Sequence, residues 1–392
     1  MLTIDGVQYD VSTYVAHHPG GKLVFQNLAG RDVTEEFAVF HPKGTKVMLR
    51  GMEVEKRKSK KLDEFLELEE QMQEMGLFES TGLFYIERAL ILMNLFAAVW
   101  SLRCSHPVAS AVCLGMFWCQ LAFIGHDVGH SSVNGRKNDL FYGTLFGNTL
   151  GGISLGWWKH SHYVHHATPN DFEKDPDIQH LPVLAVDSRM LGFYSTFHKR
   201  QFELDSIAKF LVSKQAYLFY PIMTVARFNL YAQSLAWSWP RGGLDLWCLL
   251  AFYVWFLIFA FSGPYPFMYI YVSHAVTALL HVQICISHFA EKVLCEHVDW
   301  VERQSSTTID VDCPAWMDWF HGGLQFQVEH HLFPRLPREH LRKASELLDP
   351  YFEKHKVRCI RLGFVKCNLR VLRKLSDVSS TALLLDAINL RG

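Results

Sequence analysis

The nine cysteines of this 392-residue chain include no CxxC pair, so no cysteine-based metal site is indicated. Several of them, such as Cys113, Cys119 and Cys248, lie inside apolar runs and are most simply small hydrophobes in a reduced compartment. The chain also lacks an excess of either charge, and its net charge of -1 gives no reason to expect a nucleic-acid partner. Its first residues, MLTIDGVQYD, lack the basic start and apolar core of a secretory signal, so we expect a cytosolic N-terminus.

Acidic and basic side chains are missing from two long stretches. The first runs from Leu246 to Ala290, is interrupted by the turn-forming sequence SGPYP, and has the length of two membrane spans. The second covers Cys104 to His126 and follows the apolar segment Ala89–Leu102. The alternative to membrane spans is a set of helices buried in a soluble core. We predict transmembrane helices in two hairpins, near residues 83–102, 107–125, 245–262 and 266–287.

A further uncharged segment, Leu140 to Trp158, has the length of a fifth span. If it crossed the bilayer, His130 and His162 would lie on opposite sides and could not share a site. We therefore expect the segment in or just below the membrane surface, where its glycines suit close helix packing. Residues 216–226 are too short to span a bilayer and are expected in the interface.

Histidine is gathered into three clusters. The sequences are HDVGH near residue 126, HSHYVHH near residue 162 and QVEHH near residue 327. Side chains three and four residues apart share one face of a helix, so each cluster can aim its side chains at one point. The parity of the predicted spans brings all three clusters to the cytosolic face. The alternative is a purely structural role, in which these histidines are hydrogen-bonded residues of the core. The candidate ligands in these clusters are His126, His130, His162, His165, His166, Gln327, His330 and His331.

A histidine-rich site without cysteine suits iron, copper or zinc. The clusters hold more ligands than one tetrahedral zinc ion uses, so two metal ions are indicated. His288, at the cytosolic end of the fourth span, is predicted as a further ligand, because an ionisable side chain at that depth is costly unless functional. His281 lies two turns deeper and is interpreted as a buried hydrogen-bonding residue. His160 and His321 flank the clusters and are interpreted as residues that orient the ligands.

The three boxes HxxxH, HxxHH and QxxHH resemble those of the membrane fatty acyl and sphingolipid desaturases, and the glutamine is the mark of the front-end group. The resemblance runs from about residue 125 to 356 and includes GWWKHSH, KDPDIQHLP and PAWMDWFHGGLQFQVEHHLFPRLP. It implies two non-haem iron ions, dioxygen as co-substrate and no catalytic side chain beyond the metal ligands. The iron cofactor would perform the difficult step, which is the removal of hydrogen from an unactivated methylene. Asp175 and Asp177 are interpreted as turn residues or as partners of the ligands.

The N-terminal sequences HPGG, AGRDVTEEF and FHP resemble cytochrome b5. The resemblance implies that His18 and His41 are the axial ligands of haem b, which relays electrons from NADH through NADH-cytochrome b5 reductase. Without the family pattern, both histidines would be assigned to a loop. The module is short at its N-terminus compared with the family pattern.

Together these patterns predict a mainly α-helical integral membrane protein with four transmembrane helices, a cytosolic histidine-rich di-iron domain and a small α+β haem domain. We expect it in the endoplasmic reticulum membrane with both termini cytosolic. The predicted parts are the haem domain at 1–50, a solvated linker helix at 51–80, the membrane desaturase domain at 81–360 and a C-terminal tail at 361–392.

The sequence specifies the substrate class less tightly than the type of reaction. The stretches around residues 202–235 and 301–323 resemble the plant-type group, which contains both sphingolipid Δ8 long-chain-base desaturases and Δ6 fatty acyl desaturases. We favour the sphingolipid long-chain base at Δ8, and a Δ6 (or Δ5 or Δ8) polyunsaturated fatty acyl desaturase is the alternative. A lipid hydroxylase with similar boxes and a membrane-tethered haem electron carrier are two further readings. The carrier would hold haem iron only.

Overall fold

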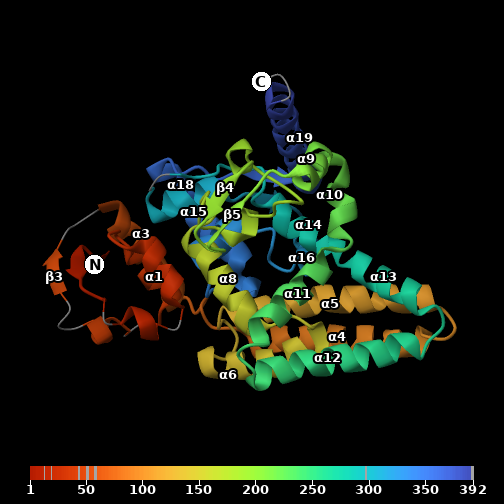
Figure 1. The fold of residues 1–392 in the computed structure, drawn as a ribbon. Helices are drawn as coiled ribbons and strands as arrows, with labels where there is room; N and C mark the ends of the chain where they lie inside the picture. The colour runs from red at the N-terminus through yellow and green to blue at the C-terminus, as the bar shows by residue number, and fades with distance from the viewer. Residues whose placement is uncertain are drawn as a thin grey trace.

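The computed structural model describes residues 1–12, 14–18, 20–42, 45–49, 53–56, 60–295 and 298–389. Pro19, the second residue of the HPGG sequence, lies outside this range. A small N-terminal module lies at one side, the long apolar helices at residues 82–102, 107–129 and 243–261 lie side by side, and shorter helices lie above them (Figure 1).

The N-terminal module packs helices against a three-stranded antiparallel sheet of order β1-β2-β3. Its small core includes Ile4, Tyr9 and Val33. The third strand pairs with β2 although it lies beyond residue 50, so the sheet extends past the predicted domain boundary. The elements are β1 (Leu2–Ile4), β2 (Val7–Tyr9), η1 (Val15–His17), α1 (Lys22–Leu28), α2 (Thr34–Phe40), η2 (Thr45–Leu49) and β3 (Glu53–Lys56).

The predicted linker helix is shorter than expected and is not solvated on all sides. Helix α3 (Lys60–Glu74) buries Phe65 and Met72 completely, and Phe65 stacks on Phe333 with 5.2 Å between ring centroids. These apolar residues recur at helical spacing, and burying them stabilises the packed state by roughly 1.5–3 kcal/mol per side chain. The helix therefore ties the N-terminal module to the rest of the protein.

The four predicted spans are confirmed. The structure contains four helical segments long and apolar enough to cross a membrane. They are α4 (Gly82–Leu102), α5 (Pro107–Gly129), α12 (Gly243–Phe261) and the pair α13 (Pro266–Val276) and α14 (Ala278–Ile286). The last span is interrupted at Thr277, whose hydroxyl donates to the His274 carbonyl at 2.6 Å. Such a bond competes with the regular backbone ladder, and the sequence analysis did not predict the interruption.

The segment 140–158 forms several short helices, and it is not among the apolar helices long enough to span a membrane. The chain turns at Gly152, which has a φ of +71° and where a Cβ atom would lie 2.3 Å from the Phe252 ring. Only glycine fits such a close, left-handed position. The elements here are α6 (Arg136–Tyr142), the π-helix η3 (Gly143–Asn148), α7 (Thr149–Gly151) and α8 (Leu155–Ala167).

Most of the remaining elements lie above α4, α5 and α12 in the view of Figure 1. Strands β4 and β5 pair antiparallel, and β6 and β7 pair parallel. The elements are η4 (Pro176–Ile178), η5 (Ser188–Met190), β4 (Phe193–Ser195), β5 (Arg200–Phe202), α9 (Ser206–Ser213), α10 (Gln215–Met223), α11 (Ala226–Ser238), α15 (Trp300–Thr307), β6 (Asp310–Asp312), η6 (Ala315–Met317), α16 (Asp318–His321), α17 (Gln327–Leu332), η7 (Arg338–His340), α18 (Leu341–His355), β7 (Arg361–Gly363) and α19 (Phe364–Asn389).

The predicted C-terminal tail is an integral part of the fold. Strand β7 pairs with β6, and α19 buries Cys367, Val371 and Leu375 in the main apolar core together with residues of α9, α10 and α14. These apolar side chains lie four residues apart and so form one face of the helix.

Candidate metal centre and haem site

Three helices and one turn carry the candidate metal ligands. The first box lies at the end of α5, the second on α8, and the third on α17, while His288 follows α14. Helix α8 begins at a regular N-cap, in which the Ser154 hydroxyl accepts a hydrogen bond from the Trp157 amide. Because α8 is helical throughout the HSHYVHH sequence, His162 and His166 share one face, as the spacing predicts. The expectation that the whole cluster aims at one point is wrong, because His165 lies in a separate group with His288 and His331.

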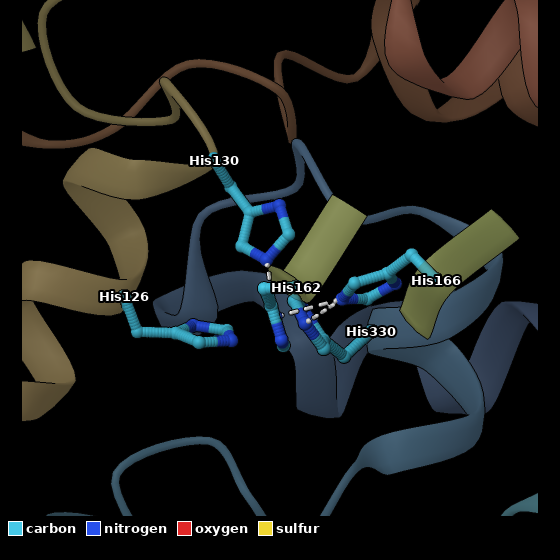
Figure 2. Close-up of side chains that lie close together, drawn as sticks. All are labelled: His126, His130, His162, His166 and His330. Atoms are coloured by element: carbon cyan, nitrogen blue, oxygen red, sulfur yellow. Dashed lines mark hydrogen bonds between the residues drawn. The ribbon is translucent and has the colours of Figure 1, made fainter. Parts of the chain in front are cut away.

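Five histidines from three helices converge on one point (Figure 2). One ring nitrogen from each lies within 4.8 Å of those of the other four. The Nε2 atoms of His130 and His162 are 3.0 Å apart, as are those of His162 and His166, and those of His166 and His330 are 3.1 Å apart. The five are His126, His130, His162, His166 and His330.

A second group lies beside the first and contains His165, His288 and His331, all buried. Their ring centroids are 4.7 to 4.9 Å apart. Gln327 is also buried, and its Oε1 lies 3.3 Å from Nε2 of His288. The groups adjoin each other where His331 stacks on His166 at 4.2 Å. All nine candidate ligands therefore lie in or beside two neighbouring groups.

The protonation of these rings suits metal binding. Burial, followed by the neighbouring imidazoles, holds the pKa of His166, His330 and His331 well below its usual range. Neutral imidazole is the form that binds a metal, because it keeps a lone pair on one nitrogen. Nε2 of His331 is buried without a hydrogen-bond partner among the described residues. An unpaired nitrogen in such a place is costly, and a metal ion would satisfy it. Eight histidines in two groups thus fit two ions.

Two side chains orient the ligands of the second group. Asp175, fully buried, lies 2.9 Å from Nδ1 of His165, and Gln304 Oε1 lies 2.9 Å from Nδ1 of His331. Gln304 also donates to the His166 carbonyl at 3.0 Å. Burial lowers the pKa of His165, but the neighbouring Asp175 and Asp177 carboxylates outweigh burial and raise it to about 9. A pKa of about 9 means that both ring nitrogens of His165 carry protons at pH 7. Nδ1 donates to Asp175, and a metal ion would displace the proton on Nε2.

Gln304 was missed by the sequence analysis. It has no spacing relation to the boxes, because α15 reaches the site only through tertiary packing. The flanking histidines that were expected to orient ligands instead make other contacts: His160 stacks on Trp237 at 4.6 Å, and His321 pairs with Gln283 at 2.8 Å. His281 lies 3.2 Å from the Met223 carbonyl, as expected of a buried hydrogen-bonding residue.

The N-terminal module brings together its two candidate haem ligands. Nε2 of His18 and Nε2 of His41 face each other at 3.4 Å, although the two residues are 23 positions apart in the sequence. Phe25 packs against His18 and Phe37 stacks on His41, each with 4.5 Å between centroids. Two opposed imidazoles between apolar rings fit the axial ligand pair of a haem.

Phe40 lies between the two candidate centres. Phe40 precedes His41 in the chain, and its ring lies 6.1 Å from the His166 ring and 6.0 Å from the rings of Tyr163 and Trp300. The haem module is thus packed on α8 and α15, with Phe40 between a candidate haem ligand and a candidate metal ligand.

Comparison with known families agrees with both halves of this arrangement. Residues 105–363 match the fatty acid desaturase family, and residues 1–62 match the cytochrome b5-like haem/steroid binding domain. The chain belongs to the fatty acid desaturase family and is an oxidoreductase with a fused cytochrome b5-like domain. The predicted resemblance is therefore confirmed. The two matches imply iron at the histidine groups and haem in the N-terminal module.

Relatives from plants and yeasts cover most of the chain. A Delta(8)-fatty-acid desaturase 2 of Arabidopsis thaliana is 37% identical over 100% of this chain and 94% of its own length. An acyl-lipid (9-3)-desaturase of Borago officinalis is 35% identical over 97% of this chain and 90% of its own. A Delta 8-(E)-sphingolipid desaturase of Komagataella phaffii is 38% identical over 82% of this chain and 63% of its own.

Proposed function

We propose that the protein is an oxygen-dependent front-end desaturase that introduces a double bond at Δ8 of a sphingolipid long-chain base. The observation that carries the proposal is the pair of adjacent histidine groups, together with relatives from both plants and yeasts whose names specify Δ8. A Δ6-type acyl desaturase is the second candidate, because the borage acyl-lipid desaturase is nearly as similar.

In this proposal the nine residues divide between two ions. His126, His130, His162, His166 and His330 are available to one ion, and His165, His288 and His331, with Gln327 beside His288, to the other. Because the groups adjoin, rings at the boundary, such as His166 and His331, can serve either ion.

The bound iron pair would supply the oxidising power, reducing dioxygen to water while two hydrogens leave neighbouring carbons of the lipid chain. The side chains of this protein would hold the two ions and orient the rings that bind them. Asp175 and Gln304 fix the rings of His165 and His331, and neither is placed to abstract hydrogen from an alkyl chain. Burial of the site keeps bulk water away from the reacting carbons.

Each turnover consumes two electrons, which we propose reach the metal pair one at a time from haem held by His18 and His41. The electrons would originate from NADH through NADH-cytochrome b5 reductase. The packing of the haem module on α8 and α15 supports this route, because Phe40 bridges the short gap between His41 and His166. Fusion of donor and acceptor in one chain raises their effective concentration.

We place the enzyme in the endoplasmic reticulum membrane, with both termini and the histidine groups on the cytosolic side. Four spans return the chain to the side on which it started, which supports this orientation. A membrane-tethered haem electron carrier is disfavoured, since eight histidines gathered in two groups, six of them buried, would then have no role.

Product analysis tests the function. Expressed in a yeast whose long-chain bases lack the Δ8 bond, the protein should yield Δ8-unsaturated bases, detected by mass spectrometry. The same cells fed fatty acids with a Δ9 bond give the competing test. New Δ6 acyl products with unchanged long-chain bases would exclude the sphingolipid assignment and support the acyl desaturase.

A further inference from the structure

Helix α8 has a second face that carries no candidate metal ligand. His160, Tyr163 and Ala167 lie three and four residues apart and so share one side of the helix, whereas His162 and His166 project from another. The haem module lies beside α8, with its helix α1 in contact with it (Figure 1). Metal binding explains His162 and His166 but leaves the other set of residues without a role.

This second face contacts the haem module at the turn that follows His18. A Cβ atom added at Gly20 would lie 3.9 Å from Cδ2 of the Tyr163 ring, and one added at Gly21 would lie 3.8 Å from Nδ1 of His160. Both are ordinary van der Waals distances, so the backbone of the turn packs against α8.

The same turn lies directly against the His18 imidazole. A Cβ atom at Gly20 would lie only 3.0 Å from Cε1 and 3.2 Å from Nδ1 of that ring. Because glycine has no Cβ atom, the backbone can approach the imidazole this closely. The His18 imidazole, the Gly20 backbone and the Tyr163 ring therefore meet at one point, and the position of the first depends on the other two.

Tyr163 also reaches the metal centre, at its hydroxyl end. The hydroxyl donates to the Gly129 carbonyl at 2.9 Å and accepts from Nζ of Lys159 at 2.8 Å. Gly129 precedes His130, and the rings of Tyr163 and His130 lie 5.9 Å apart. The contact with the haem module is made by the ring and not by the hydroxyl, so the two parts of the side chain can be separated by substitution.

Ala167 supplies part of the apolar core of the haem module. It is 1% exposed and belongs to the cluster of buried residues that contains Ile4, Tyr9 and Leu28 of the module. The module matches its family over residues 1–62 only, and a unit of about 60 residues buries little apolar surface by itself. The desaturase domain therefore completes this core.

We propose that α8 completes the haem site. Tyr163 is a positioning residue that holds the turn against the His18 imidazole, and Ala167 closes the core of the module. Haem retention and the orientation of the His18 ring then depend on the desaturase domain, although neither axial ligand comes from it. Because neither a substrate nor the formation of a double bond enters it, this assignment of the haem site is independent of the proposed function.

Two measurements on the full chain, purified with haem and iron in detergent, test the role of Tyr163. The rate of haem transfer to an excess of apomyoglobin reports haem retention. The electron paramagnetic resonance signal of the oxidised haem reports the angle between the two axial imidazole planes, which is 53° between His18 and His41. In Tyr163→Leu we expect a shifted signal and haem loss roughly three- to tenfold faster, the range for one lost aromatic contact.

Two control variants show whether the ring itself is responsible. Tyr163→Phe keeps the ring against Gly20 and loses only the hydroxyl, so its haem loss and its resonance signal should match those of the wild type. Tyr194→Leu makes the same change as Tyr163→Leu at an exposed position of β4 and should also match the wild type.

A further variant keeps the test decisive if Tyr163→Leu does not fold. Ala167→Val adds two methyl groups where the module packs on α8, and such overpacking should displace the module and speed haem loss. The non-haem iron content of each variant shows whether the desaturase domain has folded. If Tyr163→Leu loses its non-haem iron, the haem loss of Ala167→Val is compared with that of the wild type instead.

Wild-type haem loss and an unchanged resonance signal in a Tyr163→Leu variant that keeps its non-haem iron would overturn the proposal. Equally fast haem loss in Tyr163→Phe and Tyr163→Leu would also overturn it, because the hydroxyl and not the ring would then be responsible. Where Ala167→Val decides, wild-type haem loss in that variant has the same consequence. Absence of any unsaturated product would remove the desaturase assignment and leave the haem site as assigned, since none of these measurements involves turnover.

Discussion

At the scale of single residues, the site depends on which nitrogen each histidine presents. The buried Asp175 carboxylate holds Nδ1 of His165, and Gln304 holds Nδ1 of His331, so both rings direct Nε2 into the second group. A histidine without such a partner can rotate or take the other tautomer, and it then binds a metal less well. The strength of the centre therefore depends on residues that do not touch the ions.

Replacement of Asp175 by asparagine tests this dependence. Asp175→Asn keeps the size of the side chain but removes the charge that fixes His165, and we expect iron affinity to fall about 10- to 100-fold. The haem spectrum should not change. Non-haem iron per chain, measured by elemental analysis after dialysis against a weak chelator, checks the result. The matched control Asp63→Asn, on the exposed face of α3, should retain its iron. Full iron retention in Asp175→Asn would contradict the orienting role.

At the scale of elements, helix α2 joins the haem module to the desaturase domain. Its last residue, Phe40, contacts α8 and α15 through His166, Tyr163 and Trp300. Its third residue, Glu36, is buried, and the nearby Arg303 of α15 lowers the pKa of its carboxyl. One short helix thus carries both the aromatic contact and a buried carboxyl.

Removing the Phe40 ring should slow electron transfer from the haem to the metal centre. In Phe40→Ala we expect the reduced haem to be reoxidised more slowly in the presence of dioxygen and substrate, measured by stopped-flow absorbance, and Phe40→Tyr to restore the rate. The haem spectrum at equilibrium should stay normal in both. Phe37→Leu provides the contrast, because Phe37 stacks on His41 and its loss should alter the spectrum itself. Unchanged reoxidation in Phe40→Ala would exclude Phe40 from the route.

The buried carboxyl on α2 predicts a pH dependence. Burial, followed by the neighbouring Glu35 carboxylate, raises the pKa of Glu36 to about 8, from roughly 4.3 when exposed. The packed state therefore holds a proton that the exposed state loses, so stability falls as pH rises between these two values. Limited proteolysis at the N-terminal module should accelerate from pH 5 to pH 8, and Glu36→Gln should reduce that slope. An identical slope in Glu36→Gln would show that another group is responsible.

At the scale of the whole molecule, the local patterns were readable in the sequence and the long-range contacts were not. The spans followed from uncharged stretches, and the convergence of the boxes followed from helical spacing and from the parity of the crossings. Gln304, Phe40 and the burial of α19 depend on how distant segments pack, and nothing in their spacing marks them. The break at Thr277 was missed because the apolar pattern continues across it.

The haem pair was accessible only through the family resemblance. His18 and His41 have no regular spacing, and their opposition depends on the fold of the small module. The third strand of that module was assigned to a linker, because a four-residue strand with three charged residues has no apolar alternation to reveal it.

Whether one chain holds two independent iron-containing centres is decided by the iron and haem content of the purified wild-type chain and of His330→Ala. We expect two non-haem irons for each haem in the wild type. In His330→Ala we expect the full haem content, lost non-haem iron and no desaturation. A wild-type chain that contains haem iron only, or a His330→Ala variant that keeps its non-haem iron and its turnover, would contradict this expectation.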